Sequence, residues 1–338
     1  MLNFKEPRTI QLPSGKALAA VFNPGGTQCA VGDRDGVIHI IDVASGEVIQ
    51  RLRQHIEFVY CLQYLPGNNH LLSAGKDKSI REWDVESGKL VRDYAGIFSA
   101  SAPTGHVAHG LKPATRSHRM TILSLAVAPD GDWMATGSQD NTLKLWQNGD
   151  PVRTFDWHTA PVTCVRFQPE TQTLFSASRD KTIRSWSATN GAVIHRYNGH
   201  PGEIIGLEFI DRNHFVSVDD QGYVYAWEPH QEFPVAQIFK TTVPVCCATL
   251  DSEKNSLILG CARGQIEVVD VNPDNWESPD HFIYRCEPQT VHETDVRCVA
   301  VADSGNVAAT GDNSGKRVLW ASLDGGLASQ EQSSLTNA

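Results

Sequence analysis

The sequence predicts an all-β fold in which one four-stranded unit repeats along nearly the whole chain of 338 residues. Apolar and polar residues alternate over strand-length stretches separated by turn residues, which is typical of antiparallel hairpins. These stretches recur at regular distances, and the third strands of successive copies end at Ile41, Trp83, Trp146, Trp186, Trp227, Val269 and Trp320. A period of about 40–45 residues with four strands in each copy indicates a repeat architecture.

The clearest copy runs from His158 to Trp186. An apolar alternation follows the histidine and ends at Phe167, a second strand ends at Ser176, and a tight turn holds Asp180. Three copies carry a histidine, a hydroxyl residue, an aspartate and a tryptophan at the same spacing: His55, Ser73, Asp77 and Trp83; His118, Thr136, Asp140 and Trp146; and His158, Ser176, Asp180 and Trp186.

With the dipeptide Trp83-Asp84, this pattern resembles the repeat of the WD40 proteins, and the resemblance covers residues 8 to 320. It implies a β-propeller of seven four-stranded antiparallel blades. It also implies that the three sets are structural tetrads, in which hydrogen bonds run from the indole through the hydroxyl and the imidazole to the turn carboxylate. A hydrolase triad has the same residue types, but a catalytic site needs one set and this chain repeats it.

The remaining copies depart from the tetrad. Gln221 replaces the turn aspartate in the fifth copy, and Ser314 replaces it in the seventh. The first copy keeps Asp35 but has Val31 and Ile41, and the sixth has lost all four residues, with Leu259, Arg263 and Val269 at the aligned positions. We therefore expect packing, rather than a polar chain, to hold the first and sixth blades.

The ends of the chain predict how the ring closes. After Trp320 the sequence offers no fourth strand for the seventh blade, whereas residues 8–12 form a spare strand that ends before Pro13. We expect this N-terminal strand to complete the last blade, which removes two open sheet edges. The expected organisation is one propeller domain over residues 1–325 and a disordered polar tail over residues 326–338.

Charge and composition restrict the function. A formal net charge of -10 and a pI of about 5.7 make direct nucleic-acid binding unlikely to be the main role, because phosphate contacts need clustered lysine and arginine. No membrane-spanning run or signal peptide is expected, and no cysteine spacing suits a metal. Four cysteines occupy one repeated position, Cys61, Cys164, Cys247 and Cys298, where the other copies have small residues. We expect reduced structural thiols and a cytoplasmic protein, with a nuclear location as the alternative.

The strand order places the third-to-fourth and first-to-second turns on one face, and the other connections on the opposite face, which is the usual docking surface of the resembled family. On that docking face we expect the residues before each turn aspartate and those that begin each inner strand. The candidate partner-binding residues are Phe58, Tyr60, Lys76, Arg34, Arg179, Gln139, Glu203, Asp220, Asp295 and Arg297. Phe58 and Tyr60 flank Val59 in an alternating strand, so both side chains point the same way.

Two insertions lengthen the repeat. The first, residues 95–117, lies on the docking face and carries apolar and cationic residues, of which Phe98, His106, His109 and Arg116 are partner-binding candidates. His106 and His109 could form half a metal site, but no cysteine or carboxylate accompanies them, so we expect no metal and no cofactor. The second insertion, residues 272–280, holds Trp276, which either folds back onto its blade or anchors a partner.

These patterns favour a non-catalytic scaffold or recognition subunit of a multiprotein complex that docks a protein or peptide. One alternative is an enzyme or ligand-binding propeller with its site at the mouth of the central channel, where Glu203, Asp220, Asp295 and Arg297 gather. The other alternative is a reader of basic, histone-like tails, which the same three carboxylates would bind. The sequence does not identify the partner, since fold does not imply function.

Overall fold

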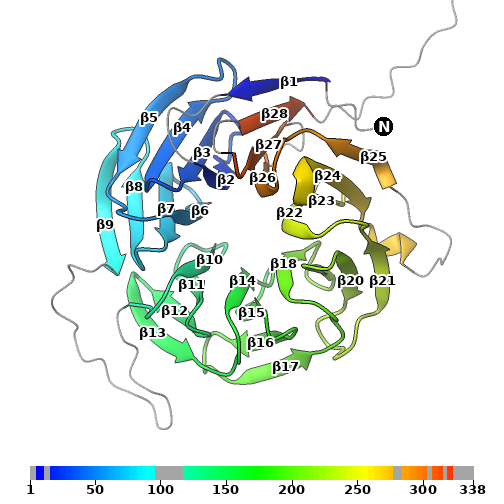
Figure 1. The fold of residues 1–338 in the computed structure, drawn as a ribbon. Coiled ribbons are helices and arrows are strands. Elements are labelled where there is room, and N and C mark those ends of the chain that lie inside the picture. Colours follow the sequence, from blue (N-terminus) through cyan, green and yellow to red (C-terminus); the bar gives the residue numbers. More distant parts are fainter. Residues whose placement is uncertain are drawn as a thin grey trace, which may run out of the picture.

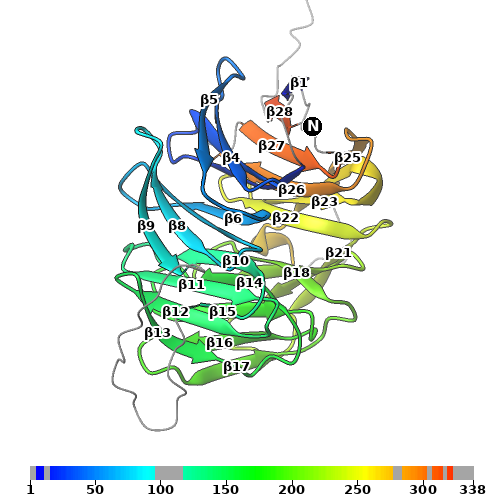
Figure 2. The same cartoon turned by 60° about the vertical axis from the view of Figure 1, so that its left-hand side comes forward.

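The computed structural model describes residues 5–10, 16–95, 117–276, 284–302, 307–314 and 318–322. Within these ranges the strands form seven four-stranded antiparallel sheets, arranged as blades around a common axis (Figure 1). In each blade the first strand lies innermost and the fourth outermost. Figure 2 shows from another side how the strands of a blade lie next to one another. The predicted propeller of four-stranded antiparallel blades is confirmed.

The strands follow the chain in order. The first three blades are β2 (Ala17–Phe22), β3 (Gln28–Asp33), β4 (Val37–Asp42) and β5 (Val48–Arg53); β6 (Val59–Tyr64), β7 (His70–Gly75), β8 (Ile80–Asp84) and β9 (Lys89–Ala95); and β10 (Ile122–Val127), β11 (Trp133–Ser138), β12 (Leu143–Gln147) and β13 (Asp150–Phe155). The next two are β14 (Val162–Phe167), β15 (Thr173–Ser178), β16 (Ile183–Ser187) and β17 (Val193–Tyr197); and β18 (Ile204–Phe209), β19 (Phe215–Asp219), β20 (Tyr223–Trp227) and β21 (Ala236–Lys240).

The sixth blade contains β22 (Val245–Asp251), β23 (Ser256–Cys261), β24 (Gln265–Asp270) and β25 (Tyr284–Thr290), with short 3-10 helices η1 (Ala262–Gly264) and η2 (Pro273–Asn275). The last sheet joins β26 (Val296–Val301), β27 (Val307–Asp312) and β28 (Val318–Ser322) to β1 (Lys5–Ile10). Strand β1 runs antiparallel to β28, and Ile10 pairs with Val318. The N-terminal strand therefore closes the ring and begins three residues before the predicted start at residue 8, while residues 11 and 12 lie outside the described residues.

Apolar side chains fill the space between neighbouring blades. One buried cluster joins Phe22 and Val31 of β2 and β3 to Cys298 and Ala309 of β26 and β27, so the first and last sheets share a core. Comparable clusters lie between each further pair of neighbours around the ring. The buried core is thus a chain of inter-blade seams, and each blade depends on both neighbours.

The repeated small position of the inner strands lies at these seams. The thiols of Cys61, Cys164 and Cys247 contact the carbonyl oxygens of Ile122, Ile205 and Val296 in the following blade, at 3.8, 3.0 and 3.6 Å. In the third blade the hydroxyl of Ser124 instead accepts the backbone N–H of Val165, at 3.0 Å. A small side chain with a polar atom suits a site where two blades approach closely. All the cysteines whose side chains the structure describes are free thiols.

The three predicted tetrads form the expected hydrogen-bonded chains. In the fourth blade the indole N–H of Trp186 donates to Ser176 Oγ at 2.9 Å, the hydroxyl donates to His158 Nε2 at 2.8 Å, and His158 Nδ1 donates to Asp180 at 2.7 Å. The second and third blades repeat this order, with His55 Nδ1 to Asp77 at 2.8 Å and His118 Nδ1 to Asp140 at 3.3 Å. The three imidazoles are buried. In each blade the hydrogen-bonded tetrad links the loop that precedes the blade, which holds the histidine, to the hairpin that holds the hydroxyl residue and the aspartate.

The fifth and seventh blades keep a carboxylate partner for the tetrad histidine, although the turn aspartate is replaced as the sequence indicates. Asp219, at the end of β19, lies 3.1 Å from His200 Nδ1, while His200 Nε2 and the Trp227 indole meet Ser217 Oγ. Asp312 occupies the same place in the seventh blade, 3.5 Å from His292 Nδ1. These carboxylates come from two residues before the turn position. The histidine therefore keeps an acidic partner although Gln221 and Ser314 fill the turn.

The geometry of the turn explains this replacement. In the third and fourth blades the strand-end residues Ser138 and Ser178 accept the backbone N–H two residues further on through their hydroxyls. Asp219 accepts the corresponding N–H of Gln221 with one carboxylate oxygen and faces His200 with the other. One aspartate thus performs both the turn-capping role of the serine and the acceptor role of the turn carboxylate.

The first blade corrects the prediction. Asp33 stands at this same strand-end position and is fully buried, and its carboxylate accepts from His39 Nε2 at 2.8 Å and from the backbone N–H groups of Asp35 and Val37. A buried polar pair therefore supports this blade together with packing. In the sixth blade Leu259 and Val269 pack in the core as expected, beside one fully buried carboxyl group, that of Glu267.

Candidate docking surface

The tetrads define one face of the ring. Their histidines lie in the connections between blades and their aspartates beside the second-to-third turns, so the hydrogen bonds between them show that both kinds of loop share this docking face. Each residue that precedes the turn position donates its backbone N–H to a residue at the start of an inner strand, at 2.8–3.1 Å. The donor and acceptor pairs are Arg34 and Lys16, Lys76 and Phe58, Gln139 and Thr121, Arg179 and Pro161, Asp220 and Glu203, Ala262 and Pro244, and Asn313 and Asp295.

Phe58 is the centre of a cationic cluster at the junction of the first two blades. The Arg34 guanidinium lies 4.6 Å from the centroid of the Phe58 ring, and the Lys76 ammonium lies 4.5 Å from it. Tyr60 packs its ring edge-on against Phe58, with centroids 6.0 Å apart. Lys76 also pairs with Glu57 at 3.1 Å, and both side chains are more than two-fifths exposed. Four sequence-predicted residues thus form one surface, which we call the Phe58 cluster: Arg34, Phe58, Tyr60 and Lys76.

The backbone around Gly75 holds this cluster in place. Val59 is fully buried, whereas Phe58 and Tyr60 are partly buried on the other side of the strand, where Tyr60 also packs against the core between the second and third blades. Lys76 donates its N–H to the Phe58 carbonyl at 2.8 Å. A Cβ atom on Gly75 would overlap that carbonyl oxygen. Because glycine alone permits this approach, Gly75 fixes the distance between the strand that carries Phe58 and the turn that carries Lys76.

The other predicted docking residues do not join the Phe58 cluster. Arg179 pairs with Glu203 at 3.4 Å across the fourth and fifth blades, and Asp220 accepts the backbone N–H of Glu203 at 2.8 Å. Gln139 is exposed in the third blade. Asp295 accepts the backbone N–H of Arg263 at 3.1 Å and lies 3.6 Å from Arg297.

This arrangement separates charge around the docking face. The Phe58 cluster brings two cations together on an aromatic ring, whereas Glu203, Asp220 and Asp295 are spread over the fifth to seventh blades. Glu203 and Asp295 each have an arginine partner, and both pairs are about half exposed. These three carboxylates therefore do not form one concentrated, buried group.

Sequence reasoning missed three exposed apolar side chains on the same face. Ile56, Met120 and Trp157 are 64%, 44% and 60% exposed and lie in the connections that precede β6, β10 and β14. Each stands within two residues of a tetrad histidine. The proximity to a tetrad histidine could have predicted their exposure, because neighbours of a buried loop histidine point towards the surface of the docking face.

Sequence reasoning also missed an ion pair between inner strands. Arg166 of β14 binds Glu208 of β18 through two bonds, Nε to Oε2 at 2.9 Å and Nη2 to Oε1 at 2.6 Å. Burial lowers the pKa of the Arg166 guanidinium, but the Glu208 carboxylate outweighs it and raises the pKa overall. The pair ties the fourth blade to the fifth by a planar, two-bond contact.

Other predictions are resolved only in part. The insertion candidates Phe98, His106, His109 and Arg116 and the tail 326–338 lie outside the described residues. Trp276 packs against the core between the fifth and sixth blades, and its ring centroid lies 5.2 Å from that of His214. Of the two alternatives for Trp276, the structure supports packing back onto its own blade rather than an exposed anchor for a partner. The described residues contain no cluster of three metal-binding side chains, and none of their helices has the length and apolarity to cross a membrane.

The fold and the polar chains define the class first: a β-propeller whose blades are held by repeated His, Ser/Thr, Asp and Trp tetrads. Comparison with known families gives the same result. A family model described as "WD domain, G-beta repeat" matches residues 46–84, 111–147 and 149–187. The segment from β5 to β16 thus carries three repeats of the WD40 type, and the propeller fold of the described residues is the one that such repeats build.

Similar curated proteins have different roles. A guanine nucleotide-binding protein subunit beta from Arabidopsis thaliana is 26% identical over 245 residues, which cover 67% of this chain and 61% of that protein. A U3 snoRNP-associated protein-like protein from the same plant is 27% identical, over 88% of this chain and 63% of its own length. An anaphase-promoting complex subunit cdh1 from Dictyostelium discoideum is 24% identical, over 80% and 38%. The chain thus spans less than two thirds of each of these relatives.

Proposed function

We propose that this protein is a non-catalytic scaffold that docks other proteins on the face of the tetrad loops, and that the Phe58 cluster is its principal contact. The observation that carries the proposal is the placement of two cations, Arg34 and Lys76, on one partly buried aromatic ring. A few residues carry most of the binding energy in protein interfaces, and these are enriched in tryptophan, tyrosine and arginine. The cluster suits a partner segment that brings a carboxylate to the cations and an apolar side chain to Phe58 and Tyr60.

Three further observations support a scaffold. The tetrads and inter-blade seams make the ring rigid, so its loops are held ready for binding at a low entropic cost. Its relatives include proteins whose names place them in complexes, a subunit of a guanine nucleotide-binding protein and a subunit of the anaphase-promoting complex. Nothing in the described residues concentrates catalytic groups. A cytoplasmic or nuclear location fits this role and the free cysteines.

The test is affinity capture from cells with mass spectrometry, in which the wild type is compared with a Phe58→Ala/Lys76→Glu variant. The control is Phe233→Ala/Lys89→Glu, which changes a phenylalanine that is more exposed than Phe58 and an exposed lysine, both in or beside third-to-fourth strand turns on the opposite face. We expect the Phe58 variant to lose at least one partner that the control retains, while circular dichroism shows both variants folded. Identical partner sets for all three proteins would contradict the proposal.

A further inference from the structure

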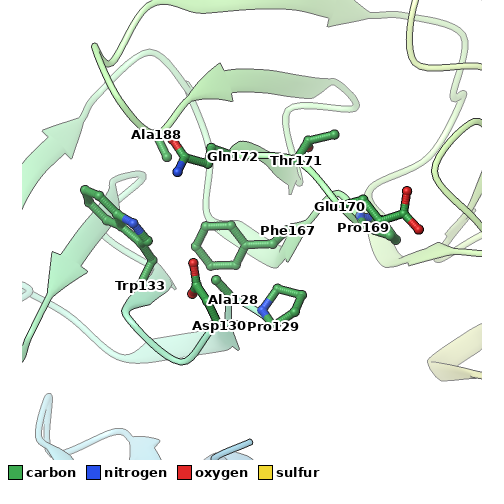
Figure 3. Close-up of a pocket in the computed structure, with 10 residues that line it drawn as sticks. All are labelled: Ala128, Pro129, Asp130, Trp133, Phe167, Pro169, Glu170, Thr171, Gln172 and Ala188. Atoms are coloured by element: carbon green, nitrogen blue, oxygen red, sulfur yellow. The ribbon is translucent and has the colours of Figure 1, made fainter.

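A second concave site lies on the face opposite the docking face. A pocket of about 510 Å³ opens between the first-to-second strand turns of the third and fourth blades (Figure 3). Trp133 and Phe167 supply aromatic rings to it, and Pro129 and Pro169 supply apolar edges. Asp130 and Glu170 are its charged lining residues, and no lysine, arginine or histidine lines it.

Two small residues create the space. Ala188 follows the third strand of the fourth blade, at a position where the first, second and sixth blades have Val43, Val85 and Val271. Ala128 follows the first strand of the third blade, where the second blade has Leu65. Both alanines are almost fully buried, and both line the pocket. A valine at the Ala188 position or a leucine at the Ala128 position would fill part of this hollow.

The lining has a specific chemistry. In Figure 3 the Phe167 ring lies in the middle of the lining, between Trp133 and the two prolines, with the Asp130 carboxylate beside it. Aromatic faces attract a cation, and nearby carboxylates hold its charge. The apolar edges suit the methylene stem of a long side chain whose charged end stays near water. A planar guanidinium meets all three conditions, because it stacks on rings and binds carboxylates with two N–H groups.

We propose that this pocket binds an arginine side chain of an extended partner segment, at a site separate from the Phe58 cluster. The guanidinium stacks against Trp133 and Phe167 and pairs with Asp130. Glu170 lies at the rim, where its carboxylate points away from Asp130 and stands 3.9 Å from Arg212, with both side chains more than half exposed. The proposal does not depend on the docking function of the opposite face, since no residue is common to the two sites.

The probe is a short peptide with one arginine between alanines, titrated into isotopically labelled protein while the Trp133 indole N–H resonance is followed. The same peptide with citrulline replaces the guanidinium by a neutral group of similar shape. We expect saturable shifts with the arginine peptide at a Kd of roughly 0.1–1 mM, and at least about fivefold weaker binding of the citrulline peptide. Equal binding of the two peptides, or no saturable shift up to about 5 mM, would overturn the proposal.

Variants separate the pocket from general charge attraction. Asp130→Asn should weaken binding about three- to tenfold, whereas Asp132→Asn, an equal change of charge outside the lining, should leave the Kd unchanged. Ala188→Val should block binding and leave the fold intact, because three other blades carry valine at this position. If Asp132→Asn weakened binding as much as Asp130→Asn did, surface charge alone would account for the shifts.

Discussion

Replacing Asp219 tests whether the strand-end carboxylate truly serves the tetrad of the fifth blade. Asp219 is fully buried and faces four donors: His200 Nδ1 and the backbone N–H groups of Gly202, Gln221 and Tyr223, at 2.9–3.1 Å. Asp219→Ala leaves these donors without an acceptor. Breaking such a buried network costs about 3–5 kcal/mol. For a cooperative unit of 338 residues the unfolding entropy is about 0.7 kcal/mol/K, so the melting temperature should fall by roughly 4–7 °C.

The assay is thermal unfolding followed by circular dichroism, with Gln221→Ala as the control. Gln221 occupies the position at which the complete tetrads have aspartate, but its side chain is exposed. We expect this control to lie within about 1 °C of the wild type, since exposed substitutions usually change stability by less than about 0.5 kcal/mol. Our interpretation would be refuted if Gln221→Ala destabilised the protein as much as Asp219→Ala, or if Asp219→Ala left the melting temperature unchanged.

Three more predictions follow from buried titratable groups. Burial lowers the pKa of His118 and His200 in the folded protein, despite their carboxylate partners. The stabilisation that the neutral imidazoles give the fold is therefore present above the unfolded pKa of about 6.5 and is lost as the pH falls below it. A melting temperature that does not change between about pH 7 and 5.5 would contradict this. Burial raises the pKa of Glu267, and its Oε2 lacks a hydrogen-bond partner among the described residues. Glu267→Gln should therefore raise the melting temperature by about 1–3 °C near pH 8, and by less near pH 5, where the wild-type carboxyl is more protonated. An equal gain at both pH values would argue against an ionised Glu267. Burial raises the pKa of the Cys164 thiol to about 11, so peptide mapping should find it alkylated by iodoacetamide only after unfolding, and labelling in the native protein would contradict the seam contact.

The repeat could be predicted from the sequence because its strongest signals are local. The period fixes the strands, and the spacing from His158 to Trp186 recurs in two other blades. The closing strand was also predictable, since the last copy lacks a fourth strand and residues near Ile10 form a spare one. Its bounds were not, because several alternating residues could pair with β28.

In the blades without a complete tetrad motif, the carboxylates that accept from histidine could not be found by aligning the turn position alone. A carboxylate at the strand end and one in the turn lie two residues apart in sequence, yet the fold brings both within reach of the same imidazole nitrogen. Asp33, Asp219 and Asp312 share the strand-end position, and that recurrence is the signal which comparison with the complete tetrads alone overlooks.

The candidate sites were harder to predict from the sequence than the fold, because they depend on contacts between blades. The alternation around Val59 predicts that Phe58 and Tyr60 point the same way, away from Val59, and this is correct. The stacking of both Arg34 and Lys76 on Phe58 depends on how two blades meet, which no local pattern encodes. The pocket beside Trp133 arises from Ala128 and Ala188 in different blades, so it became visible only when the fold brought them together.

The most direct test of the docking proposal is photo-cross-linking in cells. A benzoylphenylalanine placed at Lys76 would sit in the Phe58 cluster, and one placed at Glu253 would be equally exposed in a turn on the opposite face. We predict a discrete cross-linked protein partner from position 76 that is absent from position 253 and is lost when Arg34 is changed to glutamate. Cross-links from position 253 with none from position 76 would contradict the claim that partners dock through the Phe58 cluster.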